Sequence, residues 1–269
     1  MTLRKALVLV AVACLLAVSA SAQTPSPQAG VGGSADFGVP EGPITLYDQT
    51  DAAGGNGAPD QDFEMSFDAY DSEGADDFDV DWPDGWNIDQ VNTIGTTGTP
   101  GGALVDVNVY SDNGGTPLGG SNLCTYDDVT PTLDNAGSLT VDLPSTCFAP
   151  NGINWVAIQV NQNFGAFGQH FWSNRSVQSN NPSVWRNPGD GFASGCTDWA
   201  PQAGTLDGSS ATGCGIGGGL NPDFLFSLVG TLGEPMNPTI EVPTLGQFGL
   251  AAMLLSLLGA GIFRLRRRS

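Results

Sequence analysis

The fold is decided by the sequence LVDVNVY, residues 104–110, in which branched apolar residues alternate with polar ones. The sequence INWVAIQVN, residues 153–161, repeats this alternation in its second half. Successive side chains of a β-strand point to opposite faces of a sheet, so each segment has one apolar and one polar face. The residues of the apolar faces are Val105, Val107, Val109, Val156, Ile158 and Val160. Both segments are therefore predicted to be half-buried strands.

Six further segments have strand-forming composition, and clusters of Gly, Pro, Asn and Ser separate them. They are residues 44–47, 77–80, 88–94, 138–143, 169–172 and 224–228. The body of the sequence contains neither a convincing 3.6-residue apolar period nor a repeat of solenoid or propeller length. Many short strands at this spacing predict an all-β sandwich at residues 36–232, and a jelly-roll arrangement is our first choice.

The charge of the chain is strongly asymmetric. All 28 acidic residues lie between Asp36 and Glu241, and Arg175 and Arg186 are the only Arg or Lys residues in that region, so the body carries a net charge of −26. Such a charge keeps a domain soluble and repels anionic partners, which excludes nucleic acid as a partner. Two explanations remain, a solvated acidic surface suited to a salty medium and the binding of Ca²⁺.

The sequence DDFDVDWPDGW, residues 76–86, contains three carboxylates at alternate positions. These are Asp77, Asp79 and Asp81. Carboxylate oxygens bind Ca²⁺, but an EF-hand loop starting at Asp77 would lack the required glycine and glutamate. Alternation offers a second interpretation, an edge strand with Phe78 and Val80 facing inward and the carboxylates in water. We keep the three as candidate ligands of a structural Ca²⁺ and predict no other cofactor.

Four cysteines lie in the body: Cys124, Cys147, Cys196 and Cys214. An even number in an exported chain predicts two disulfides, and three pairings are formally open. We favour Cys124–Cys147 and Cys196–Cys214, because each pair would close one loop rich in Gly, Asp and Ser. A zinc site is a poor alternative, since the sequence contains no CxxC and a single histidine.

The six tryptophans are the other group of side chains that can form a binding site. Exposed indole rings stack on sugar rings, and polar neighbours bond to sugar hydroxyls. The polar neighbours here are Asn174, Arg175, Arg186, Asn187 and Asp198. Trp155 lies in the strand at 153–161 and is predicted to be structural. Trp185 and Trp199 lie in loop-like sequence and are the candidates for glycan stacking.

Hydrolysis would require a nucleophile, a base and an orienting group. His170 and Ser173 can be combined with an aspartate on paper, but the sequence contains no GxSxG, HExxH or P-loop motif. His170 precedes Phe171 and Trp172, a context typical of a packing residue. We therefore predict a non-catalytic protein and name no catalytic residue, with a secreted hydrolase as the minor alternative.

Both ends of the chain carry targeting features. Residues 1–22 have a short basic start, an apolar run and a small-residue end, which predicts a cleaved secretory signal peptide. Residues 23–35 are a Pro, Gly and Ser-rich leader, predicted to be flexible. Near the C-terminus, residues 246–263 lack charge and are long enough to span a bilayer as a helix. The following arginines predict a cytoplasmic end: Arg264, Arg266, Arg267 and Arg268.

The sequence VPTLGQFG, residues 242–249, precedes this span directly after a linker at 233–241. Together with the span and the arginine cluster at 264–268, it resembles the IPTL-CTERM sorting signal of Gram-negative bacteria, whose pattern is Ile-Pro-Thr-Leu-x-x-Trp-Gly. The positions that match the pattern are Val242, Pro243, Thr244, Leu245, Phe248 and Gly249. Two of them depart from it conservatively, Val242 from isoleucine and Phe248 from tryptophan.

The resemblance implies a partner and a destination. An exosortase-like membrane transpeptidase would cut near the motif and transfer the body from the inner membrane to the cell surface or extracellular matrix. A permanent membrane anchor is the alternative for residues 242–269. For the body we expect glycan or matrix binding, and the alternative is a structural coat or matrix protein without a small ligand.

Overall fold

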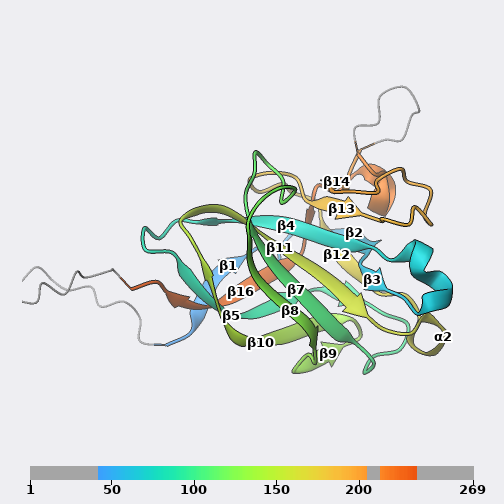
Figure 1. Ribbon diagram of the computed structural model, residues 1–269, viewed down its shortest axis with the longest axis horizontal. Coiled ribbons are helices and arrows are strands. Elements are labelled where there is room, and N and C mark those ends of the chain that lie inside the picture. Colours follow the sequence, from blue (N-terminus) through green and yellow to red (C-terminus); the bar gives the residue numbers. More distant parts are fainter. Residues whose placement is uncertain (1–41, 205–212, 235–269) are drawn as a thin grey trace, which may run out of the picture. The chain divides into compact units, whose positions relative to one another are not determined.

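The computed structural model describes residues 42–204 and 213–234, and it is a β-sandwich (Figure 1). One sheet has the spatial order β1 (Ile44–Asp48), β16 (Phe226–Leu232), β5 (Trp86–Thr93), β10 (Ser138–Ala149), β9 (Leu133–Asn135). The larger sheet has the order β14 (Ala200–Pro201), β13 (Val184–Arg186), β4 (Glu73–Val80), β11 (Gly152–Asn161), β7 (Leu104–Ser111), β8 (Asn122–Val129), with β3 (Gln61–Asp62) paired to β11.

A smaller sheet contains β15 (Asp223–Phe224), β12 (Phe171–Arg175), β2 (Ala53–Pro59) and β6 (Gly95–Thr96). Three short helical turns complete the described chain: η1 (Met65–Tyr70), α2 (Phe164–Phe167) and η2 (Ile216–Gly219). All strand pairs are antiparallel except β3 with β11. The prediction of an all-β sandwich is confirmed.

The core lies between the sheets and is built from the alternating residues of their strands. Val105, Val107 and Val109 on β7 are fully buried, as are Val156 and Ile158 on β11. They pack in one cluster with apolar residues of β5, β10 and β16 from the opposite sheet. The two-residue alternation of 104–110 and 153–161 therefore identified the inward face of the larger sheet correctly.

The prediction of an edge strand at Asp77 is wrong. β4 lies between β11 and β13, and Asp77 is buried beside Phe78 and Val80. The loop before β13 covers the carboxylate, because the Asn181 amide and side chain both donate to Asp77 Oδ2, at 2.9 and 2.7 Å. Asp79 is exposed on the same strand, as alternation predicted.

Both favoured disulfides are confirmed. Cys124 on β8 is bonded to Cys147 on β10, which joins the two large sheets. Cys196 is bonded to Cys214 across a loop, with a Cα–Cα distance of 5.8 Å. Disulfides are typical of proteins that fold outside the cytoplasm, so these two crosslinks indicate an extracytoplasmic, oxidising location.

Several predictions concern residues outside those that the structure describes. These are the signal peptide at 1–22, the leader at 23–35, and the sorting signal at 242–269 with its motif, span and arginine cluster. Within 42–204 and 213–234, no helix has the length and apolar character needed to cross a bilayer.

Candidate functional site

Strand β12 is the centre of the candidate site because it pairs with all three other strands of the smaller sheet. It pairs with β2 on one side, and with β6 and β15 on the other. Between β6 and β15, Ser173 N–H donates to Ile94 O at 2.9 Å and Leu225 N–H donates to Ser173 O at 2.9 Å. Ile94 N–H in turn donates to Leu225 O at 3.1 Å. These three backbone hydrogen bonds fix Ile94, Ser173 and Leu225 as the rigid floor of a groove.

One wall of the groove is an irregular part of β2. Ser173 is paired with Gly57 and Arg175 with Ala53, so three β2 residues, 54–56, stand opposite Asn174 alone. Such a bulge bends the strand and redirects its side chains. Glycine is required here, because Gly55 has φ +79° and a Cβ on Gly57 would lie 2.9 Å from Trp172 O. The sequence AGGNGAP thus forms a strand that strand-propensity rules do not predict.

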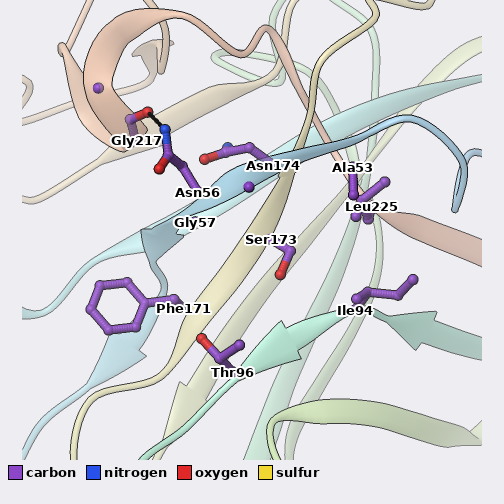
Figure 2. Close-up of a pocket in the computed structure, with 12 residues that line it drawn as sticks. Ala53, Asn56, Gly57, Ile94, Thr96, Phe171, Ser173, Asn174, Gly217 and Leu225 are labelled. Carbon is purple, nitrogen blue, oxygen red and sulfur yellow. Dashed lines mark hydrogen bonds between the residues drawn. The ribbon is translucent and has the colours of Figure 1, made fainter.

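The groove has a volume of about 580 Å³ and is open to solvent (Figure 2). Its polar groups are the side chains of Asn56, Thr96, Ser173 and Asn174, and Phe171 supplies one aromatic ring. Because Phe171 and Ser173 are two residues apart on β12, their side chains project to the same face. Amides and hydroxyls around one aromatic ring are the groups that bind hydroxyl-rich ligands.

Asn174 is held at the groove by a network of side chains. Its Nδ2 donates to Gln202 Oε1 at 2.7 Å, and its Oδ1, almost fully buried, has no hydrogen-bond partner among the described residues. Asn56 Nδ2 donates to Gly217 O at 2.7 Å, and Figure 2 shows the two asparagines side by side near Gly217. A Cβ on Gly217 would lie 2.3 Å from Asn174 Oδ1, so only glycine leaves this oxygen in place.

Two buried carboxyl groups, Asp76 on β4 and Asp223 on β15, have raised pKa values. Asp76 Oδ2 accepts hydrogen bonds from the Gln49 side chain and from Phe224 N–H, both at 2.7 Å. Burial and the charge of Asp223 raise the pKa of Asp76 well above its ordinary value. Burial also raises the pKa of Asp223 to about 7, although Arg175 favours its charged form. Burial and mutual repulsion therefore favour the protonated form of these two carboxyl groups.

The candidate calcium ligands are not brought together as a metal site. Asp77 is buried under Asn181, while Asp79 and Asp81 are exposed. Burial raises the pKa of Asp77 to about 6. In the part of the chain that the structure describes, no group of three or more His, Cys, Asp or Glu side chains has the arrangement of a metal site.

His170 is a buried packing residue with both ring nitrogens occupied. Nδ1 lies 2.6 Å from Asp60 Oδ1, and Nε2 lies 2.9 Å from Gly137 O. Burial lowers the pKa of His170, but the charge and hydrogen bond of Asp60 outweigh burial, so the pKa is raised. Nε2 faces a carbonyl rather than a hydroxyl, so the triad of His170 with Ser173 that can be written from the sequence is not assembled.

The prediction of a stacking surface at Trp185 is wrong. Its ring is fully buried, and Nε1 donates to Pro59 O. The ring is covered because β13 pairs with β4 and the loop of Phe192 packs on it. Trp199 is half-buried, and the Arg186 guanidinium lies 4.3 Å from its ring centroid. Trp155 is fully buried, as predicted.

Comparison with protein families and with curated proteins gives no match. Among solved structures, the chain is similar to the cysteine protease and lectin-like domains of Cwp84, a surface layer associated protein of Clostridium difficile. The identity is 14% and the TM-score is 0.35. The match covers 61% of this chain and 32% of the other, so the similarity spans about a third of that protein. A similarity of this extent assigns neither a family nor an activity.

Proposed function

We propose that the protein is an exported, non-catalytic binding module that takes a neutral glycan in the groove over β12. The observation that carries this proposal is one open groove lined by the side chains of Asn56, Thr96 and Ser173 together with the ring of Phe171. A sugar hydroxyl would exchange hydrogen bonds with Ser173 or Thr96, while an apolar sugar face stacks on Phe171. The groove replaces the surface first expected at Trp185.

The charge of the body narrows the ligand class. With a net charge of −26 on residues 36–241, the surface repels sulfated, phosphorylated and uronic-acid glycans. Neutral hexose or N-acetylhexosamine chains meet no such barrier, and their hydroxyl and amide groups can form hydrogen bonds with Asn56, Thr96 and Ser173. A structural coat role without a small ligand is the second candidate, because the sandwich carries two disulfides that suit an exposed scaffold.

The proposed location is supported by the two disulfides and by the sequence features at the ends of the chain. A signal peptide at 1–22 would export the protein, and an IPTL-CTERM-like signal at 242–269 would present it to an exosortase-like transpeptidase in the inner membrane. The product would be displayed on the cell surface or in the extracellular matrix of a Gram-negative bacterium. We further propose that the sandwich belongs to the jelly-roll type found in bacterial surface proteins.

A neutral-glycan array with the full chain purified in a mild detergent tests the groove. Phe171→Ala should abolish binding, because the stacking face is lost, and Asn56→Ala should weaken it by about five- to tenfold, the value of one hydrogen bond. Phe148→Ala is the matched control, since Phe148 is a 51% exposed ring on β10 that does not line the groove. Absence of binding to every neutral glycan would leave the coat role.

A further inference from the structure

A closed ring of four aromatic side chains lies where η1 and α2 meet. The centroid distances around this ring are 6.5 Å for Phe63–Tyr70, 6.3 Å for Tyr70–Phe67, 5.6 Å for Phe67–Phe164 and 6.1 Å for Phe164–Phe63. The planes of neighbouring rings are inclined by 55–69°, so no two of the four rings are stacked face to face. We call these four residues the aromatic cage.

The aromatic cage lines a pocket of about 190 Å³, to which Gln169 and Phe192 also contribute. Three of its rings are substantially exposed: Phe67 by 38%, Tyr70 by 40% and Phe164 by 43%. Met65 beside them is 87% exposed. Single exposed apolar residues are ordinary on a protein surface, but a cluster of exposed rings around a pocket marks a binding site.

Hydrogen bonds from neighbouring polar residues hold the cage open without a ligand. Glu64 Oε2 accepts from Phe164 N–H at 2.8 Å, which ties η1 to α2. Asp71 Oδ1 accepts from Phe63 N–H at 2.9 Å, and Asn187 Nδ2 donates to the carbonyl of Ala69 within η1 at 2.8 Å. Because these bonds fix the backbone on both sides, the pocket is preformed.

The electrostatic field at the cage favours a cation. Asp62, Glu64, Asp68 and Asp71 lie on the segment that carries three of the four rings. Burial raises the pKa of Asp71 to about 6, and the charges of Asp62 and Asp68 add to the rise. The arginines among the described residues are engaged elsewhere, Arg175 with Asp51 and Asp223, and Arg186 with Glu73.

We propose that the aromatic cage binds a small quaternary ammonium compound. In a square with sides of about 6 Å the centre lies about 4 Å from each corner, so an atom between four rings at this spacing is within the range of a cation–π contact. The ring faces contact the N-methyl groups, and the surrounding carboxylates attract the charge. A primary ammonium suits the pocket less well, because it needs several hydrogen-bond acceptors at its head and the lining offers only Gln169 and the Tyr70 hydroxyl.

Calorimetric titration of the full chain in mild detergent with choline tests the proposal. The matched probe is 3,3-dimethyl-1-butanol, in which carbon replaces the charged nitrogen of choline at nearly the same size. A cation–π site should bind choline about tenfold more tightly than this neutral isostere. Equal affinity for the two would overturn the proposal, because the pocket would then be merely apolar. So would the absence of choline binding.

Single substitutions test whether choline binds at the aromatic cage. Phe67→Ala should abolish choline binding, whereas Phe148→Ala should leave it unchanged. Glu64→Gln keeps an acceptor for Phe164 N–H but removes one charge, so affinity should fall about two- to fivefold at low salt and the salt dependence should weaken. If Phe67→Ala folds poorly, Glu64→Gln still tests the proposal, provided that its thermal unfolding curve matches that of the wild-type chain. Unchanged choline affinity in this folded variant would refute the contribution of the carboxylates to binding.

A binding experiment with phosphatidylcholine vesicles distinguishes free choline from the choline headgroup of a lipid. Free choline should compete with any binding to phosphatidylcholine vesicles, since both would use the cage. Binding to vesicles with no binding of free choline would overturn the proposal, because it would assign recognition to the lipid surface. The glycan array is independent of this site, so failure of either experiment is distinguishable from failure of the other.

Discussion

Replacing Asp223 with asparagine should stabilise the protein at pH 8 and leave it nearly unchanged at pH 4. In the folded chain burial raises the pKa of Asp223 from 3.8 to about 7. The folded state therefore binds a proton more tightly than the unfolded state, so the free energy of unfolding is largest below pH 3.8 and falls as the pH rises towards 7. At 1.36 kcal/mol per pKa unit, the loss is at most about 4 kcal/mol.

Asparagine removes the charge and keeps an oxygen that can accept the hydrogen bond from Ser179 N–H. The pKa of about 7 already includes the attraction of Arg175, which retains its 2.8 Å contact with Asp51 in the variant. The expected net gain at pH 8 is about 2–3 kcal/mol. For a domain of this size that corresponds to a rise in Tm of about 4–12 °C.

Thermal unfolding followed by circular dichroism between pH 4 and pH 8 measures this effect. Asp127→Asn is the control, because Asp127 is an exposed carboxylate on β8. Like Asp223→Asn, this substitution removes one negative charge from the protein. The difference between the two variants isolates the buried site from general charge repulsion. If Asp223→Asn raises Tm at pH 8 no more than Asp127→Asn does, the raised pKa of Asp223 in the folded chain is wrong.

Three further results are expected. Serine at both Cys124 and Cys147 opens a crosslink with a sequence separation of 23 and should lower the free energy of unfolding by about 3 kcal/mol, measured by guanidinium titration; an unchanged midpoint would contradict this. His170→Ala leaves Asp60 buried without its partner and should cost about 3–5 kcal/mol in the same titration, whereas a loss below 1 kcal/mol would argue against the buried ion pair. Pro243→Ala should leave the C-terminus unprocessed if the tail is a sorting signal, as mass analysis of the mature chain would reveal; normal processing, or an intact Ser269 in the wild-type chain, would favour a permanent anchor.

The strands that the sequence predicted best are those whose register follows from alternation alone. β7 and β11 are paired with each other without a register shift, and β7 alternates between buried and half-buried residues along its length. On β11 the inward residues follow the same alternation, but Trp155 and Ala157 on the other face are also buried. β2 was missed because its pairing depends on a bulge of glycines opposite Asn174, which no two-residue period reveals. Trp185 was misplaced because β13 has only three residues, too few for any pattern.

The binding residues were predictable only in part. Asn174 was among the polar side chains noted around the tryptophans, but its neighbour Asn56 lies on the missed strand β2. The aromatic cage joins Phe164 to residues about 100 positions earlier, and sequence spacing carries no information about such a contact. The sequence FEMSFDAY, residues 63–70, held the one available signal, three aromatic residues in a short acidic segment without strand or helix periodicity.

The pairing of β1 with β16 has a mechanical consequence. Gly233 is bonded to Gly85 at the Val80 end of β4, while η1 precedes the Glu73 end, so the last described strand leaves the sandwich opposite the aromatic cage (Figure 1). A pull between a C-terminal attachment and a ligand held in the cage therefore runs along β16. Because β16 is bonded to β1 on one side and to β5 on the other, with hydrogen bonds perpendicular to the strands, this force shears two ladders at once. A pull applied to the two chain ends instead would peel β1 from β16 one bonded pair at a time, so the domain should resist load in the first direction much better than in the second.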